Sequence, residues 1–209
     1  MSFTDYSSLQ TSVSNFLARS DLTSVIPDFI TLFEAEANRQ LRTRQMELTQ
    51  STTPSSGVFS LPSDYLAWRN LTWTSGGVTK VLQYVHPSEL PDMFPSSPAD
   101  TPQVFTITGT TDGLGQAQIM PTTASAVNFT YYQKIQSLST TTGSTTNWLL
   151  TAHPNVYLEG AMTEACVYTK DYDTAAIWKT RRDASFDAIT KLDEKTRGPS
   201  RIRVTGITP

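Results

Sequence analysis

The chain has 209 residues, of which 38% are hydrophobic and 17% charged, and a length of this kind favours one main domain with a substantial insertion. Its formal net charge of −3 argues against broad electrostatic capture of nucleic acid, which needs a strongly basic face. Cys166 is the only cysteine, so an intramolecular disulfide framework and a cysteine-based zinc site are excluded.

Two amphipathic helices are predicted at the start of the chain. Apolar residues at helical spacing from Tyr6 to Leu17 predict the first, with Thr4 or Asp5 as its N-cap. Pro27 is typical of a helix start, and an apolar stripe predicts that this second helix runs to about Leu48. The residues of that stripe are Ile30, Phe33, Ala37 and Leu41.

The composition then changes. Residues 49–57 are rich in Ser, Thr, Pro and Gly and are predicted to be a linker. From Thr49 to Thr151, 33 of 103 residues are Ser or Thr, and the apolar period becomes alternating. Short strands with Gly, Pro or Asp turns predict a compact antiparallel sandwich or small barrel. The strand candidates are residues 58–61, 68–74, 78–85, 103–108, 116–120 and 127–135. Residues 86–102 contain five prolines and are predicted to leave this sheet, with one helical turn.

Helical spacing returns after a second loop rich in Ser and Thr, residues 138–147. One helix carries Tyr157 and Ala161 on one face, and a last helix from about Asp173 to Thr196 uses Trp178 and Phe186. Neither terminal helical pair can bury its stripe alone, so we expect the two pairs to form one antiparallel bundle.

The predicted fold class is therefore α+β. Residues 1–57 and 148–197 form the two halves of the helical bundle, residues 58–147 form an inserted β-sandwich or barrel domain, and residues 198–209 form an extended tail. The residues expected to pack the bundle are Phe33, Leu41, Tyr157, Trp178 and Phe186.

The tail alternates basic and apolar residues, as a strand does. The segment from Thr196 onward carries a charge of +3, whereas residues 1–195 sum to −6. No neighbouring segment offers it a strand partner, which leaves two readings open: a strand added to another protein, or a frayed terminus. The alternating residues are Arg201, Ile202, Arg203 and Val204, followed by Ile207.

The residues that could carry chemistry form no catalytic or metal constellation. His86 and His153 each precede a proline, which places them at element boundaries, and Cys166 lies on an apolar helical face. Asp171 and Asp173 lack a third metal ligand at suitable spacing. We therefore expect no enzyme activity, no cofactor and no metal, and we also expect neither a secretion signal nor a membrane span.

Several phrases, in order, resemble the head-to-tail adaptor proteins of short-tailed bacteriophages. They cover nearly the whole chain, with an irregular match at residues 86–102. The phrases are Ile26 to Arg42, Leu61-Pro-Ser-Asp-Tyr-Leu66, Tyr131-Tyr-Gln-Lys-Ile135, Thr146-Asn-Trp-Leu-Leu150 and Pro154 to Ala161.

The resemblance implies a structural virion protein of the neck, assembled in the host cytoplasm. It implies a dodecameric ring under the portal protein, whose tail residues dock on the portal and whose channel passes genomic DNA without sequence-specific binding. The bundle residues would also serve ring packing. The tail or nozzle proteins would bind loops that contain Met93, Phe94, Thr141 and Ser144.

Two other classes of protein remain open at this stage. A glycan- or receptor-binding tail protein would use the β domain, with Trp68 and Trp73 as a stacking surface. A small phage hydrolase would need His86 or His153.

Overall fold

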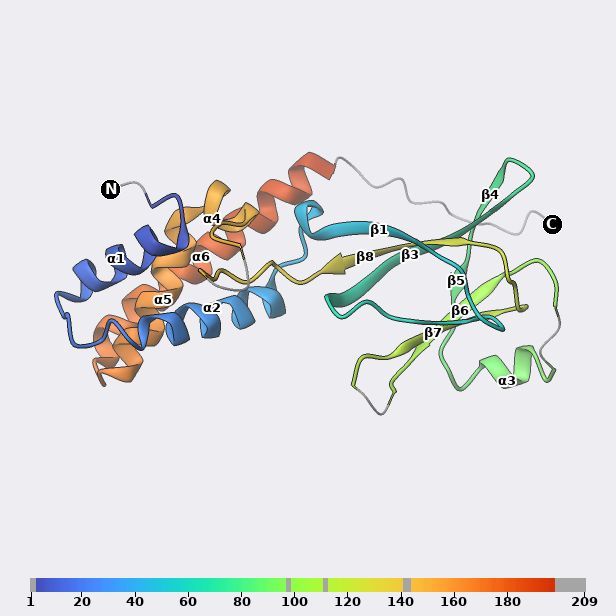
Figure 1. The fold of residues 1–209 in the computed structure, drawn as a ribbon, viewed down its shortest axis with the longest axis horizontal. Coiled ribbons are helices and arrows are strands. Elements are labelled where there is room, and N and C mark those ends of the chain that lie inside the picture. Colours follow the sequence, from blue (N-terminus) through green and yellow to red (C-terminus); the bar gives the residue numbers. More distant parts are fainter. Residues whose placement is uncertain (1–2, 97–98, 111–112, 141–143, 198–209) are drawn as a thin grey trace, which may run out of the picture. The chain divides into compact units, whose positions relative to one another are not determined.

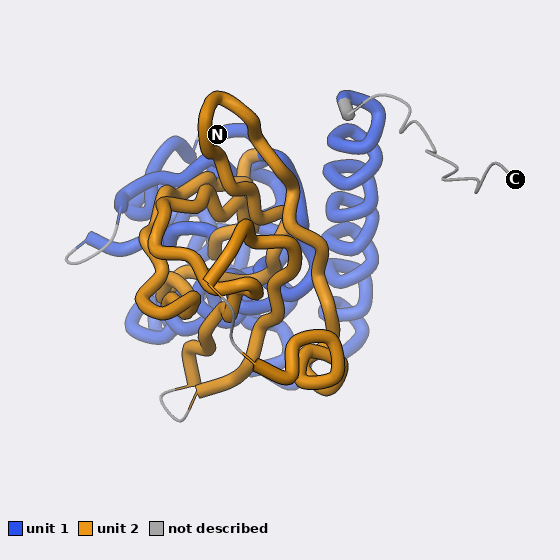
Figure 2. The backbone as a smooth tube through the Cα atoms, turned by 90° about the vertical axis from the view of Figure 1, so that its right-hand side faces the viewer, with its two compact units in different colours: residues 1–44, 135–209 blue, residues 45–134 orange. Residues whose placement is uncertain are grey.

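The computed structural model describes residues 3–96, 99–110, 113–140 and 144–197, and the chain divides into two compact units (Figure 2). Residues 1–44 and 135–209 form what we call the helical unit, and residues 45–134 form the β unit. The predicted linker at residues 49–57 is wrong in its first part, because strand β1 (Glu47–Thr52) lies there. The β unit thus includes residues that we had assigned to the bundle.

The first two helices follow from local sequence signals (Figure 1). Helix α1 (Tyr6–Leu17) has Asp5 as its N-cap: the Asp5 carboxylate accepts the Ser8 N–H at 2.8 Å, and the Asp5 N–H donates back to the Ser8 hydroxyl at 3.1 Å. Helix α2 (Ile26–Gln40) has proline in its first turn, as predicted. It ends eight residues before the predicted Leu48, because the backbone of buried Leu41 is extended and a short turn, η1 (Arg44–Met46), follows.

The second group of helices consists of α4 (Trp148–Ala152), α5 (Pro154–Tyr168) and α6 (Tyr172–Arg197). Asn147 is the N-cap of helix α4, and its side-chain oxygen accepts the Leu150 N–H at 2.9 Å. Helix α5 is buried on nearly every side and contacts α1, α2, α4 and α6. The N-terminal and C-terminal helices of the chain therefore share one core.

The β unit contains two four-stranded sheets among its described residues. The first has the order β1-β8-β3-β4 and is antiparallel throughout; the second has the order β2-β7-β6-β5, in which the β5–β6 pair is parallel. We predicted that the insertion would be antiparallel throughout, and this prediction is wrong at the β5–β6 pair. The strands after β1 are β2 (Val58–Ser60), β3 (Tyr65–Ser75), β4 (Val78–Val81), β5 (Gln83–Tyr84), β6 (Val104–Thr108), β7 (Gln116–Met120) and β8 (Val127–Gln133).

Side chains from both sheets meet in one hydrophobic cluster. Leu71 and Phe129 come from the first sheet, Phe105 and Ile119 from the second, and all four are almost completely buried. A smaller cluster lies beneath helix α3 (Leu90–Met93), which supplies the helical turn predicted between residues 86 and 102.

The α+β class is confirmed. No helix within the described ranges is both long and apolar enough to cross a membrane.

Gly160 on α5 allows the close contact between α5 and α2. A Cβ atom at this position would overlap the ring of Phe33, which is itself buried. We predict that Gly160→Ala destabilises the protein by about 1–3 kcal/mol, because overpacking of a dense core outweighs the roughly 1 kcal/mol that alanine gains in helix propensity. The free energy of unfolding from denaturant titration measures this.

Gly109→Ala is the matched control, because nothing lies within 4 Å of a Cβ built at Gly109. Its unfolding transition should stay close to that of the unmodified protein. Equal stability of the Gly160→Ala and Gly109→Ala variants would contradict the packing argument.

Candidate assembly surfaces

Four of the five side chains predicted to pack the bundle and the ring lie inside the helical unit. Phe33, Leu41, Tyr157 and Phe186 are buried. The Phe33 ring meets Tyr157 edge-on at 4.9 Å between centroids and stacks on Phe186 at 6.0 Å. These four side chains hold one subunit together, and their burial leaves no surface for a neighbouring subunit to contact.

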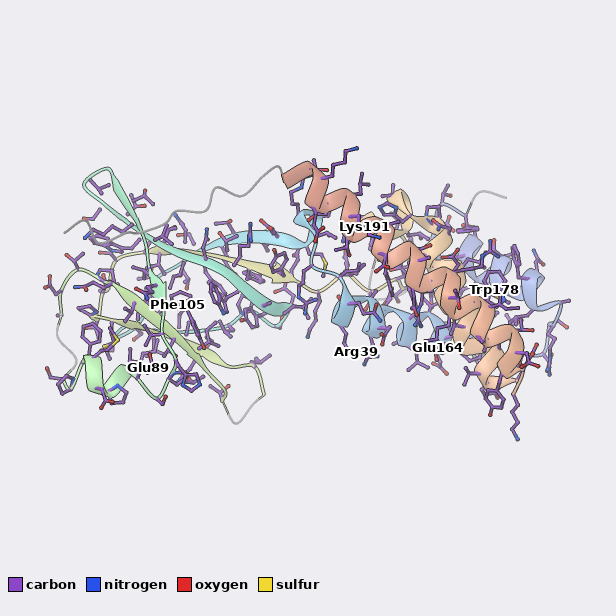
Figure 3. All side chains as sticks on the ribbon, turned by 180° about the vertical axis from the view of Figure 1, so that it is seen from behind. Arg39, Glu89, Phe105, Glu164, Trp178 and Lys191 are labelled. Atoms are coloured by element: carbon purple, nitrogen blue, oxygen red, sulfur yellow. The ribbon has the colours of Figure 1, made fainter. Side chains whose placement is uncertain are left out.

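The fifth residue, Trp178 on α6, lies at a surface (Figure 3). It is half-buried, packs edge-on against Phe16 at 6.1 Å, and carries the Arg181 guanidinium 5.1 Å above its ring. Beside it is a cleft of about 430 Å³, whose walls include Met162 and Cys166. Apolar side chains at the adjoining helix ends are exposed: Phe16, Val167, Tyr168, Tyr172 and Ile177. We call this set, with Trp178, the helix-end surface.

The predicted tail-facing residues do not form one loop cluster. Met93 is exposed at the end of α3, whereas Phe94 packs against the small cluster beneath α3 and lines a cleft of about 250 Å³. Ser144 belongs to the helical unit, where its carbonyl accepts the Ser139 N–H at 3.0 Å. Thr141 lies outside the described residues, as do the tail residues Arg201, Ile202, Arg203, Val204 and Ile207.

A buried polar network, which the sequence reasoning missed, fixes the segment that returns from the β unit. The Glu34 carboxylate on α2 is only 4% exposed; its Oε1 accepts the Leu138 N–H at 2.9 Å and the Tyr157 hydroxyl at 3.1 Å. The Asn147 amide donates to the Tyr157 hydroxyl at 2.6 Å and to the Gln136 carbonyl at 2.8 Å. A glutamate on a helix is ordinarily a solvent-facing residue, so its spacing gave no signal of this role.

One turn further along α2, the Asn38 side chain accepts the Ile135 N–H at 2.8 Å. Glu34 and Asn38 lie on one face of the helix, and each satisfies a backbone donor of the extended segment after β8. The segment that leads from α2 into the β unit is held in the same way, because the Asp193 carboxylate of α6 accepts the Arg44 N–H at 3.0 Å. Side chains of the helical unit thus fix both chain segments where they leave it.

Burial raises the pKa of Glu34, and the hydrogen bonds from Leu138, Ser137 and Tyr157 oppose this shift by favouring the charged form. Burial, together with the nearby Glu34 charge, raises the pKa of Tyr157 as well, so its hydroxyl remains a donor. Burial thus outweighs the three hydrogen bonds, and the net shift of the Glu34 pKa is upward.

Histidine, cysteine and tryptophan side chains have mainly structural surroundings. His153 is the N-cap of α5, and the Nδ1 atom of His86 lies 2.8 Å from the Ser88 hydroxyl in an exposed turn. Burial raises the pKa of Cys166. Trp68 stacks on Tyr84 at 5.1 Å, which occupies one face of its ring. Among the described residues, no group of three His, Cys, Asp or Glu side chains could hold a metal ion.

We predict that Glu34→Gln changes how stability depends on pH. The folded-state pKa of Glu34 lies above its ordinary value of 4.5, so its contribution is complete below about pH 4.5 and is lost as the pH rises through the folded-state pKa. Glutamine keeps an acceptor for Leu138 and Tyr157 without a charge. The free energy of unfolding, measured from pH 4 to 8, should favour the glutamine variant increasingly as the pH rises.

Glu34→Ala is the comparison that removes the acceptor. It leaves the Leu138 N–H and the Tyr157 hydroxyl without their partner, and we expect a loss of about 1–3 kcal/mol across the whole pH range. A glutamine variant as unstable as the alanine variant at pH 8 would show that the charge itself is required.

Comparison with known proteins identifies a family for this chain. The family model of the SU10 adaptor protein matches residues 4–205, which include almost all of both units. No curated protein matches the chain significantly. Because the family match covers nearly the full length, with helices on both sides of an inserted β unit, the chain belongs to the SU10 adaptor protein family.

Proposed function

We propose that the protein is a head-to-tail adaptor of a tailed bacteriophage, which assembles as a dodecameric ring beneath the portal protein in the neck of the virion. The family match over residues 4–205 is the observation that carries this proposal, since it supports a structural adaptor role in a phage particle. The ring would extend the DNA exit channel and provide the attachment platform for the tail.

The helical unit suits the body of such a ring. The outer face of α6 carries both signs of charge, with Lys179, Arg181 and Lys191 alongside Asp187. Mixed charge allows copies to lie side by side without strong repulsion. The helix-end surface adds exposed aromatic and aliphatic side chains, the kind of residue that protein interfaces bury at their centres.

The division into two units suits a protein with two kinds of partner. The tail segment after Arg197 follows directly from α6 and would dock on the portal as an added strand. The β unit, through surfaces such as the exposed Met93, would meet the tail or nozzle proteins. DNA would pass through the channel without sequence-specific contacts, as expected for a chain of net charge −3.

The central test is assembly on the portal. We predict that purified protein mixed with purified portal protein forms closed rings of twelve subunits, because the portal would align neighbouring copies for lateral packing. Electron microscopy and mass photometry measure the rings and their stoichiometry. If the protein remains unassembled and unbound at micromolar concentrations of portal, the adaptor proposal is wrong.

A second prediction concerns the tail. Truncation after Arg197 should weaken portal binding, and Ile202→Asp should weaken it more than Arg201→Ala. Burial of an isoleucine contributes about 1.5–3 kcal/mol, equivalent to at least a tenfold change in Kd per subunit, whereas an exposed ion pair contributes only about 0–1 kcal/mol. Pull-down and titration with portal protein compare the variants. Equal binding by the full-length and truncated chains would instead identify the segment as a frayed terminus.

A further inference from the structure

The antiparallel sheet of the β unit ends in two open edges. Its order is β1-β8-β3-β4, and within the described part of the chain neither β1 nor β4 has a strand on its outer side (Figure 1). All four residues of β4 are exposed, and its two valines, Val78 and Val81, are 60% and 69% exposed. An edge strand with exposed apolar side chains is a template for pairing with another strand.

The backbone of β4 directs hydrogen-bonding groups toward its open edge at regular intervals. The β3–β4 hairpin turns at two glycines, so its closing pair, Ser75 and Val78, exchanges hydrogen bonds. In an antiparallel pair every second residue bonds to the partner strand, and Leu82 fits this alternation, since its N–H donates to the Leu71 carbonyl at 2.8 Å. Thr79 and Val81 are the residues between, so their N–H and C=O groups point away from β3, toward the open edge.

Strand direction allows a second copy of the sheet to continue the first. Every neighbouring pair in the sheet is antiparallel, so β1 and β4, at opposite ends of four strands, run in opposite directions. A copy placed beside the first in the same orientation would bring its β1 antiparallel to β4. We propose that β4 of each subunit pairs with β1 of the next, so that the sheets join edge to edge around the ring.

The side chains along the two edges are complementary. On β1, Gln50 and Thr52 share the core side of the sheet with their partners Phe129 and Val127. Together with Phe59, they line a cleft of about 90 Å³ next to the open edge. Val78 lies on the core side of β4, because its partner Ser75 follows Leu71 and Trp73 at alternate positions.

In an antiparallel joint, Val78 of one subunit therefore reaches the cleft beside β1 of the next, which has room for one aliphatic side chain.

Charge disfavours pairing of two β4 edges. Lys80 is the only charged residue of β4, whereas Glu47, the only charged residue of β1, lies at the end of that strand and is ion-paired with Arg69 at 3.2 Å. Pairing of two β4 edges with their core sides together would place the two lysines opposite or next to each other, whereas a β4–β1 joint places Lys80 opposite the uncharged Gln50 or Leu48. The β4–β1 joint avoids this repulsion and is heterologous, so it propagates from copy to copy as a ring requires.

The inference rests on the proposed ring and is tested by blocking one edge. Thr79→Pro removes an outward N–H of β4 without removing a β3–β4 hydrogen bond, and proline is tolerated on an edge strand. We expect this variant to keep its circular dichroism spectrum and its portal binding, and to yield at least tenfold fewer closed rings on portal. Thr79→Val is the matched control, because it also lacks the Thr79 hydroxyl but keeps the N–H.

The edge joint is wrong if Thr79→Pro forms rings as efficiently as Thr79→Val. If the unmodified protein forms no rings on portal at all, the proposed function fails and the joint fails with it. Normal rings from the unmodified and valine chains, together with failure of the folded proline variant, would support both.

Cysteine pairs test the geometry directly. A joint between β4 and β1 must keep the core sides of the two sheets together. Of the registers that do so, the two with the greatest overlap of β4 and β1 place position 50 opposite position 78 or position 80. Two double variants test these registers: Gln50→Cys with Val78→Cys, and Gln50→Cys with Lys80→Cys. When its rings are oxidised, the variant that matches the true register should give a ladder of covalent dimers, trimers and longer chains. Single variants should give none, since Cys166 is buried.

A band of dimers alone from a single variant would indicate pairing of like edges and overturn the proposal. Rings that form normally but give no ladder from either double variant would also overturn it, while leaving the proposed ring intact.

Discussion

The burial of helix α5 is the constraint on which the rest of the structure depends. A helix that is buried on nearly every side needs neighbours all around it. Helix α5 packs against α1 and α2, which come before the β unit in sequence, and against α4 and α6, its neighbours in sequence. Gly160 lets the Phe33 ring approach the α5 backbone, and Tyr157 reaches Glu34 on α2. Because the helices that precede and follow the β unit in sequence must meet at α5, the β unit between them is an excursion that leaves after Arg44 and returns at Ile135.

Elements that show one clean local signal could be predicted from the sequence. The limits of α1 follow from periodicity and its capping residue, α6 follows from periodicity, and the strands near residues 104–120 follow from alternation. Strand β1 could not be predicted in this way, because it is an edge strand whose residues are mostly exposed and whose composition is that of a linker. The parallel β5–β6 pair joins segments that only tertiary structure brings together.

The candidate surfaces were harder to predict than the fold, for a related reason. Large apolar residues were predicted to pack between subunits as well as within one, but Phe33 and Phe186 are buried inside the helical unit and stack on each other. What remains for partners is the set of apolar residues that the fold leaves uncovered, such as Tyr172 and Ile177, and the open strand edges. Exposure of this kind depends on the whole fold, so a sequence pattern alone does not separate core from interface.

The short length of β4 bears on when the sheets would join. Its two outward-facing residues offer at most two N–H and two C=O groups, and each hydrogen bond contributes about 0.5–1.5 kcal/mol net. Burial of Val78 adds about 1.5–3 kcal/mol, whereas association of two free proteins costs about 4–15 kcal/mol. These quantities are of similar size, so one joint holds two free subunits only weakly. On the proposed ring, a portal that aligns neighbouring copies would make the encounter intramolecular, and the same weak joint would then close at each position.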